Sequence, residues 1–424
     1  MSPLNEPIIK FSYRIKCLGF KTLFVLNMKE EFSIDEEALY FNASYGVVPK
    51  YVREYHYNLL SECEYNPYKW FTSKYKEKVL ETKHALSTYL NCSTHDFVIV
   101  DNSSSGANSV FNSLEFDSKS AIVVLETAYG LIVNLVNKFK QKYNLEVVVV
   151  PVNLNSIHLI PLYVNLQLVK LKSIGFNVKL VCVDHISSCP AVVMPVKQIS
   201  KVCKNNGVPL FVDGAHALGQ IKLDISELED WGMTYWVSDT HKWFFSPKGS
   251  AVLWVTKEKQ ENVVPTIDCA SIGSNGCTVI QNQYKELSEF ESRFLYLGTK
   301  DYTPWISISG AIHFIKDIGG YDLIINRNKQ IATWAQTYMS VKLDTECTNK
   351  DLIASMGNVK LPFIKSKQES EDLVNYLEKR NVFAVVFEYQ NEYWIRLCIQ
   401  VFVSVTNVVK LTKMLMEYRS LIAI

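Results

Sequence analysis

The chain has 424 residues, of which 48% are hydrophobic and 21% are charged, a composition typical of a globular protein with a substantial core. Its 44 basic and 43 acidic side chains give a formal net charge of +1, which argues against a nucleic-acid-binding surface or an anionic membrane partner. The ten cysteines are scattered and form no CxxC pair, so we expect reduced thiols and no metal site. No stretch of the sequence approaches the ~18 uninterrupted apolar residues of a membrane span.

The first 27 residues carry four basic side chains and a single acid, Glu6. Lys21 and Thr22 interrupt the apolar part and no small-residue cleavage site follows, so a secretory signal fits badly. A mitochondrial presequence and an extension of uncertain order both remain open for this stretch. We expect a cytoplasmic protein, with a mitochondrial location as the alternative.

Between residues 97 and 255, short apolar runs rich in β-branched residues alternate with helix-length segments. This pattern predicts an α/β fold with a mainly parallel seven-stranded sheet covered by helices on both faces. The segment between the last two runs is too short for a helical crossover, so these runs are expected to pair antiparallel. The seven runs are 97–101, 121–125, 146–152, 179–184, 210–213, 234–237 and 251–255.

Polar residues follow four of these runs, beginning at Asp101, Glu126, Asp184 and Asp213. The carboxyl ends of parallel strands meet at one edge of the sheet, and ligands of such sheets bind there. We therefore expect a single polar site at this edge.

After residue 255 the pattern changes to a long polar segment (257–300), a helical stretch (305–339) and then a smaller α+β unit with helices at 369–380 and 405–418. The domain boundaries that we expect are 1–30 for an amino-terminal extension, 31–55 for a segment that joins the small domain, 56–320 for the large domain and 321–424 for the small carboxyl-terminal domain.

A lysine flanked by aromatic residues, Lys242, lies shortly after Asp213, the acid that ends an apolar run. Pyridoxal 5′-phosphate (PLP) requires an amine that forms an imine with its aldehyde and a buried carboxylate that keeps its pyridine nitrogen protonated. We therefore predict that the chain is a PLP enzyme, with Lys242 as the Schiff base lysine and Asp213 as the partner of the pyridine nitrogen.

The remaining parts of a PLP site also have candidates. The phosphate requires backbone N–H groups at a helix N-terminus and short hydroxyls, which Ser104, Ser105 and Gly106 supply ahead of a helix expected at 107–114. Tyr129 is the candidate for stacking on the ring, and Arg396 is the candidate for holding the substrate carboxylate.

In this combination the chain resembles the class V (fold type I) PLP enzymes, in the branch of isopenicillin N epimerase-like proteins, hercynylcysteine sulfoxide lyases and cysteine desulfurases. The Asn-Ala-Thr-Thr phosphate loop of the family is similar to residues 102–105, and its Asp-Gly-Ala-His and His-Lys-Trp elements are present at 213–216 and 241–243. The resemblance implies that His216 neighbours the ring hydroxyl of PLP and that His241 is a phosphate ligand. It spans roughly residues 30–410, in order.

Two further elements of the resemblance concern the partner subunit and the substrate. The family's Gly-Thr-x-Asp-Tyr is present at 298–302, which implies that Gly298 and Thr299 reach the phosphate of the partner subunit and that the enzyme is a homodimer. The segment 41–46 resembles the family's amino-terminal strand, with Asn42 as a substrate-binding residue, and 395–398 resembles the segment of the carboxylate arginine. The chain departs from the family at Asp239, where a small or amide residue is more usual, and at Val403, which replaces an asparagine.

Several reactions are compatible with this site, because PLP with a lysine base labilises the Cα proton of an amino acid. A cysteine desulfurase requires a cysteine shortly ahead of the carboxylate arginine; 382–389 contains none, and Cys398 lies within an apolar strand. Our preferred prediction is a carbon–sulfur lyase that resembles the hercynylcysteine sulfoxide lyases of ergothioneine synthesis.

The alternatives are an epimerase, a class V aminotransferase and a protein of this fold that has lost catalysis. An epimerase requires a second acid on the opposite face of the ring, for which only Tyr129 and His185 are candidates. His185 is equally well explained as a hydrogen-bonded histidine at the end of a strand. Retention of every cofactor group argues against the non-catalytic protein.

Overall fold

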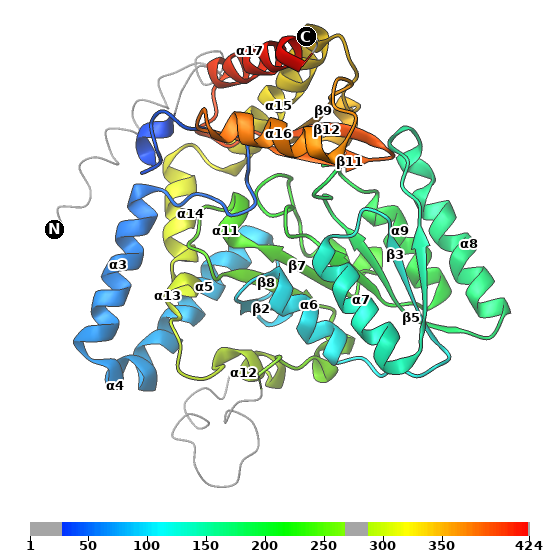
Figure 1. The fold of residues 1–424 in the computed structure, drawn as a ribbon. Coiled ribbons are helices and arrows are strands. Elements are labelled where there is room, and N and C mark those ends of the chain that lie inside the picture. The colour runs from blue at the N-terminus through cyan, green and yellow to red at the C-terminus, as the bar shows by residue number, and fades with distance from the viewer. Residues whose placement is uncertain (1–27, 268–286, 423–424) are drawn as a thin grey trace.

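The computed structural model describes residues 28–267 and 287–422 (Figure 1). The expected amino-terminal extension, apart from its last three residues, and residues 268–286 of the polar segment lie outside the described residues. Among the helices of the described ranges, none is long and apolar enough to cross a membrane.

The seven predicted strands form one sheet in the order β2-β8-β7-β6-β5-β3-β4. Strand β8 is antiparallel to both of its neighbours, and the other pairs are parallel. The α/β fold with a mainly parallel sheet is therefore confirmed, as is the antiparallel pairing of the last two runs. The strands are β2 (Phe97–Val100), β3 (Ser120–Leu125), β4 (Glu146–Val150), β5 (Asn177–Asp184), β6 (Leu210–Asp213), β7 (Tyr235–Asp239) and β8 (Ala251–Val255).

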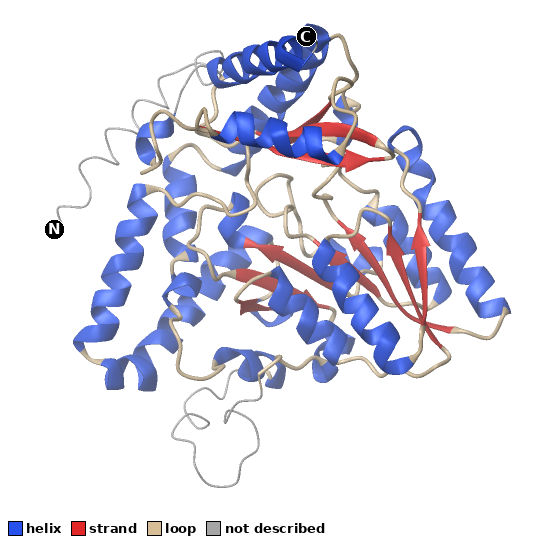
Figure 2. Cartoon of the chain, viewed as in Figure 1, coloured by secondary structure: helices blue, strands red, loops and turns tan. Residues whose placement is uncertain are grey.

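Helices lie on both faces of the sheet (Figure 2). Alternating side chains of the strands enter two hydrophobic cores, one on each face. In β6, for example, Leu210 and Val212 belong to one core and Phe211 belongs to the other. The first core is covered by α5 (Tyr75–Leu90), α8 (Ile160–Ser173), α9 (Val196–Asn206) and α14 (Ile308–Asp317). The second is covered by α6 (Ser103–Asn112), α7 (Gly130–Tyr143) and α12 (Glu289–Leu295).

The carboxyl-terminal unit contains a three-stranded antiparallel sheet in the order β11-β12-β9 with three longer helices (dark yellow to red in Figure 1). The amino-terminal strand β1 pairs in parallel with β10, so residues far apart in the sequence lie side by side here. These elements are β1 (Leu39–Tyr40), α15 (Tyr321–Leu343), β9 (Met356–Lys360), α16 (Lys367–Glu378), β10 (Val382–Phe383), β11 (Val385–Tyr389), β12 (Glu392–Cys398) and α17 (Val405–Ile422).

The remaining helices complete the large unit: α3 (Lys50–Tyr65), α4 (Pro67–Lys69), α10 (Glu227–Trp231), α11 (Thr240–Trp243) and α13 (Thr303–Ile306). The segment expected to be helical at 305–339 is helical, and it consists of α13, α14 and α15 in succession. Gly319 and Gly320, with φ of 107° and 87°, separate α14 from α15, and only glycine adopts such angles readily. The polar segment 257–300 also contains α12, which the sequence analysis missed.

Candidate active site

The acid Asp213 ends β6 in the middle of the sheet, and its side chain is buried. Its Oδ1 accepts a hydrogen bond of 3.0 Å from the backbone N–H of Ala215. Burial raises the pKa of Asp213, while the Ala215 hydrogen bond and the charge of Lys242 act in the opposite direction. A buried carboxylate needs a cationic partner to remain ionised, and a protonated pyridine nitrogen is such a partner.

Lys242 lies on the single-turn helix α11, which connects β7 to the antiparallel β8. Its Nζ is 2.9 Å from Oδ2 of Asp239, a residue that is 2% exposed. The carboxylate of Asp239 also accepts hydrogen bonds from N (2.7 Å) and Oγ (3.1 Å) of Ser103 in the first turn of α6. The lysine amine therefore lies beside the N-terminus of the helix that was predicted to bind phosphate.

Of the three predicted phosphate ligands in the first turn of α6, Ser104 is the one whose hydrogen-bond donors have no partner within the described ranges. Ser105 donates from both N (2.8 Å) and Oγ (3.1 Å) to Oδ1 of Asn102, the N-cap of the helix, and Gly106 N bonds to Asn102 O. The amide and hydroxyl of the half-buried Ser104 make no hydrogen bond within the described ranges. A helix N-terminus with an unused N–H fits a phosphate group, and Ser104 is the member of the predicted trio that is free to bind it. The helix begins at Ser103, four residues earlier than expected.

Two of the three histidines at this edge are held by tryptophans. Trp243 Nε1 donates to Nδ1 of His216 (3.1 Å), and Trp236 Nε1 donates to Nδ1 of His185 (3.2 Å). Burial and the charge of Lys242 lower the pKa of His216 well below its ordinary value. Burial lowers the pKa of His185 to about 4. Both rings are therefore neutral at physiological pH, with the proton on Nε2.

The third histidine, His241, lies beside Lys242. Its Nδ1 is 3.1 Å from the carbonyl oxygen of Ser250, so Nδ1 carries a proton and donates it. Its Nε2 is 3.9 Å from Oδ2 of Asp239. Burial lowers the pKa of His241, against the charge of Asp239.

Arg396 of β12 brings a buried guanidinium, 1% exposed, to the same edge. Its Nη1 donates to the carbonyl oxygen (2.9 Å) and hydroxyl (2.8 Å) of Ser188, and its Nη2 donates to Asn42 Oδ1 (3.3 Å) and Ser44 Oγ (3.2 Å). No carboxylate of the described ranges forms an ion pair with Arg396. A buried cation of this kind, supported by neutral partners, fits a substrate carboxylate.

The contacts of Ser44, Ser188 and Cys189 with this arginine were not predicted from the sequence. The Sγ of Cys189 is 3.8 Å from Arg396 Nη1. The signals in the sequence are that 187–189 lies shortly after the predicted strand 179–184 and that Ser44 lies within 41–46. The contact of Cys189 with Arg396, 207 residues away, depends on how the small unit packs.

Three predicted ligands are not drawn into this cluster within one chain. Tyr129 is 55% exposed at the N-cap of α7. Thr299 is exposed, and its Oγ1 is 3.1 Å from the hydroxyl of Tyr296. Gly298 precedes it with a φ of 90°. An ion pair between Lys300 and Asp101 fixes the segment beside the end of β2.

The amino-terminal segment and the small unit close over the backbone of the lysine motif. A Cβ on Gly46, whose φ is 63°, would lie 1.7 Å from the carbonyl oxygen of His241, so only glycine fits this close approach. Gln400 Nε2 donates to the carbonyl oxygen of Lys242 at 3.1 Å. Two distant parts of the chain therefore contact the backbone at His241 and Lys242.

A match to a known protein family identifies the enzymes to which this chain is related. The aminotransferase class-V family matches residues 47–385. The chain belongs to this family. Its cofactor is accordingly PLP, and the protein is a PLP-dependent enzyme.

Curated relatives match over most of the chain. The L-cysteine desulfhydrase-like protein lolT1 of Epichloe uncinata is 26% identical, over 90% of this chain and 92% of that protein. The hercynylcysteine sulfoxide lyase of Schizosaccharomyces pombe is 23% identical, over 93% of this chain and 97% of that protein.

Solved structures share the fold. The cystine C-S lyase C-DES in complex with cysteine persulfide aligns with a TM-score of 0.74 and 18% identity, over 90% of this chain and 97% of that chain. The cysteine desulfurase CsdA of Escherichia coli aligns with a TM-score of 0.74 and 14% identity, over 95% of this chain and 99% of that chain.

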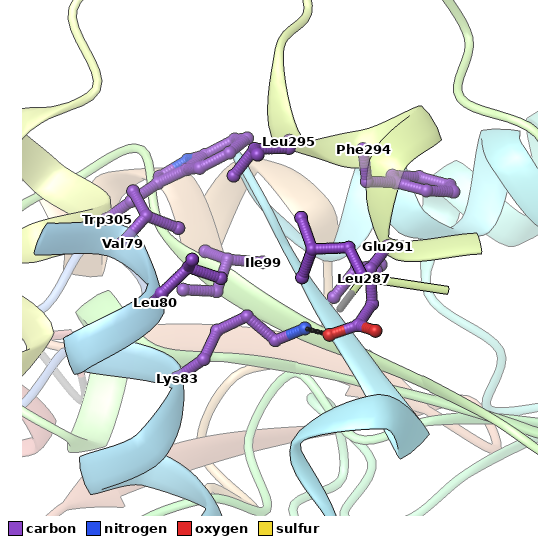
Figure 3. A pocket seen from close by; sticks show the side chains of 10 residues that line it. Val79, Leu80, Lys83, Ile99, Leu287, Glu291, Phe294, Leu295 and Trp305 are labelled. Carbon is purple, nitrogen blue, oxygen red and sulfur yellow. Dashed lines mark hydrogen bonds and ion pairs between the residues drawn. The ribbon is translucent and has the colours of Figure 1, made fainter. Parts of the chain in front are cut away.

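A separate pocket lies between α5, β2 and α12 (Figure 3). It is lined by apolar side chains such as Val79, Ile99 and Trp305, and by the ion pair of Lys83 with Glu291. Its volume of about 10 Å³ is close to that of a single water-sized probe, so it cannot hold a substrate.

Proposed function

We propose that this PLP enzyme is a carbon–sulfur lyase, which removes the sulfur group from Cβ of a cysteine-type amino acid. The observation that carries the proposal is the buried Arg396, without a carboxylate partner in the described ranges, at the same edge as Lys242 and Asp213. That combination suits an α-amino acid, and the relatives named above supply the preference for cysteine-type compounds. When bound, PLP supplies an electron sink that stabilises negative charge at Cα.

The residues of this chain have separate roles in the proposed reaction. Arg396 and Asn42 bind the substrate carboxylate, and Asp213 holds the proton on the pyridine nitrogen. Lys242 Nζ takes the proton from Cα, the electron pair of that bond forms the Cα–Cβ double bond, and the sulfur group leaves with the Cβ–S electron pair. Hydrolysis of the unsaturated amino acid gives pyruvate and ammonia.

The substrate that we propose first is a cysteine conjugate sulfoxide of the hercynylcysteine type. L-cysteine is the second candidate, because several relatives are named L-cysteine desulfhydrases, at 26–28% identity. Elimination from the sulfoxide yields a sulfenic acid, and elimination from L-cysteine yields sulfide. The two substrates therefore differ in their sulfur product and share pyruvate.

The surroundings of the candidate second acids weigh against an epimerase. His185 is buried and neutral, with a pKa lowered to about 4, so it is a poor proton donor at neutral pH. Tyr129 is 55% exposed and makes no ring contact within the described ranges. Cys398 is fully buried in β12, and 382–389 contains no cysteine, which weighs against a desulfurase.

The test is to supply hercynylcysteine sulfoxide and L-cysteine separately to the purified holoenzyme in deuterated water and to measure pyruvate, sulfide and deuterium at Cα. We expect pyruvate from at least one substrate, and a loss of about 10²–10⁴-fold in kcat with Lys242→Ala. Lys257→Ala, on the exposed surface, is the matched control and should retain full activity. Deuterium in both enantiomers without pyruvate would establish the epimerase instead. Transfer of the amino group to a 2-oxo acid would establish the aminotransferase.

We also propose that the enzyme is a homodimer, in which Gly298 and Thr299 of one subunit contact the phosphate bound by the other. The exposed position of Thr299 and the left-handed backbone of Gly298 support this role. The division into a large domain (56–320) and a small domain (321–424) remains our proposal. So does a reducing compartment such as the cytoplasm, which the seven free cysteines of the described ranges support.

A further inference from the structure

Asp239 lies at the centre of the site, between Lys242 and the first turn of α6. It ends β7, is 2% exposed, and its carboxylate contacts two other elements. On one side Oδ2 is 2.9 Å from Lys242 Nζ; on the other the carboxylate accepts both donors of Ser103, at 2.7 Å from N and 3.1 Å from Oγ. One carboxylate therefore connects the lysine anchor to the first turn of the phosphate-binding helix.

The charged and titratable groups around Asp239 come from α11, from β6 and from the turn that follows β6. His241 and Lys242 belong to α11, with His241 Nε2 at 3.9 Å from Oδ2. Asp213, from β6, is affected by the charges of both Asp239 and Lys242. His216, which follows β6, also feels the charge of Lys242 and is neutral. Within the described ranges, Lys242 is therefore the only lysine or arginine that forms an ion pair with Asp239.

We propose that Asp239 is a positioning residue that holds the Lys242 ammonium as an ion pair against the N-terminus of α6 until the cofactor arrives. The inference rests on the proposed role of Lys242 as the anchor of PLP. In this arrangement the amine and the phosphate cradle are already aligned, but the amine has to leave the carboxylate and lose its proton before it attacks an aldehyde. Asp239 therefore aligns the site and slows the capture of the cofactor.

Substitution of Asp239 by asparagine separates the effect of its hydrogen bonds to Ser103 from the effect of its negative charge. In Asp239→Asn the side-chain oxygen still accepts the hydrogen bond of Ser103 N, and the hydroxyl of Ser103 can turn to accept from the new amide. The ion pair with Lys242 is lost. Asp239→Ala loses both the ion pair and the bonds to Ser103, so it also loosens the first turn of α6.

The experiment follows the capture of pyridoxal and of PLP by cofactor-free protein, using the visible absorbance of the bound aldehyde. Because the Lys242 amine no longer has to break an ion pair with a carboxylate, we expect Asp239→Asn to capture pyridoxal about tenfold faster at neutral pH. Pyridoxal lacks the phosphate, so its capture reports on the amine alone.

The phosphate contributes a second, separable effect. Removing a negative charge next to the phosphate cradle should raise the preference for PLP over pyridoxal in Asp239→Asn. Asp230→Asn, an exposed carboxylate on α10, is the matched control and should change neither measurement. Asp239→Ala should capture pyridoxal fast but lose the preference for PLP, since α6 is no longer held.

The outcomes separate this inference from the proposed function. If Asp239→Asn captures pyridoxal at the wild-type rate, Asp239 is not the counter-ion of Lys242. If wild-type protein captures neither aldehyde, or Lys242→Ala captures both as well as wild type, the anchor itself is wrong. Equal melting temperatures of wild type and Asp239→Asn exclude a general loss of folding as the cause of any difference.

Discussion

Two carboxylates, Asp184 and Asp213, lie side by side where β5 and β6 end, in register with each other. Both are buried. Burial raises the pKa of Asp184 well above its ordinary value and the charge of Asp213 adds to the rise, while the hydroxyl of Thr127 (3.1 Å from Oδ2) opposes it. Burial and the charge of Asp213 therefore favour the neutral form of Asp184, and under the proposed function Asp213 is the carboxylate that faces the pyridine nitrogen.

This assignment predicts losses of different size for the same substitution at the two positions. Asp213→Asn should lower kcat/KM by about 100-fold or more, because an amide cannot stabilise a protonated pyridine nitrogen. A fall of about two units in the pKa of that nitrogen lowers its protonated fraction by this factor. Asp184→Asn should lose less than about tenfold, because its amide oxygen still accepts from Thr127 and no charge is removed. Steady-state kinetics with saturating PLP measures both. Equal losses in the two variants would contradict the assignment.

At the residue scale, the sequence predicts which side chains one motif brings to the site. It does not predict the contacts between motifs that are far apart in the chain. Lys242 and Asp213 each follow an apolar run, so strand ends and side-chain chemistry together bring them to one edge of the sheet. The contacts of Asp239 with Ser103 and of Arg396 with Ser188 join positions 136 and 208 residues apart. Such pairs depend on how β7 packs against α6 and how β12 packs over β5, which local patterns do not encode.

At the scale of elements, a buried ion pair fastens α12 to α5. Lys83 Nζ is 2.6 Å from Oε1 of Glu291, and both side chains are at most 5% exposed (Figure 3). Oε2 of Glu291 is 2.6 Å from Nδ1 of His95 and also accepts from Ser288, the N-cap of α12. Burial acts to raise the pKa of Glu291, but the charge and hydrogen bonds of Lys83, with those of His95 and Ser288, outweigh it and lower the pKa.

Glu291→Gln should destabilise the protein by about 3–5 kcal/mol, because it leaves the buried Lys83 without a counter-charge. Since the folded-state pKa of Glu291 is lowered, its contribution is present at neutral pH and is lost as the pH falls, so the difference from wild type should narrow in acid. Urea unfolding at several pH values measures this.

Two variants make the test specific. Glu289→Gln, on the exposed face of the same helix, is the control and should cost at most ~1 kcal/mol. The double variant Lys83→Met/Glu291→Leu should recover most of the loss, because it removes both charges. A Glu291→Gln protein as stable as Glu289→Gln would show that α12 is held by its apolar residues alone.

Predicting elements from the sequence succeeded where the hydrophobic pattern is uninterrupted. All seven strands of the large sheet, and the reversal of β8, follow from apolar runs and the length of the segments between them. Predictions failed where one or two residues decide a boundary. Gly319 and Gly320 split an apparently continuous helical pattern, and the Asn102 cap starts α6 earlier than its apolar residues indicate. Helix caps and left-handed residues act through backbone hydrogen bonds and torsion angles, which the spacing of hydrophobic residues does not report.

At the scale of the whole molecule, the site is assembled from the large sheet, the amino-terminal segment and the carboxyl-terminal unit. Arg396 of the carboxyl-terminal unit contacts Asn42 of the amino-terminal segment and Ser188 after β5. Gln400 of the same unit donates to the backbone carbonyl oxygen of Lys242. Within one chain Thr299 is left exposed, held close to the end of β2 by the pair of Lys300 with Asp101. A threonine that binds the phosphate of a second subunit has to be exposed and held in place, as Thr299 is here.

A hybrid dimer tests whether Thr299 acts on the partner subunit. Thr299→Ala should weaken PLP binding about ten- to a hundredfold, because a hydrogen bond to a charged phosphate contributes about 1.5–3 kcal/mol. A differently tagged Lys242→Ala chain is co-expressed with a Thr299→Ala chain, and the hybrid is isolated. If Thr299 acts between subunits, the only anchoring lysine of the hybrid faces an intact Thr299, and that site should bind PLP as tightly as the wild type. A hybrid of Lys242→Ala with the wild-type chain is the control and should show the same affinity. Binding as weak as in the Thr299→Ala homodimer would place the threonine at the site of its own chain, and a strictly monomeric protein would contradict the proposed dimer.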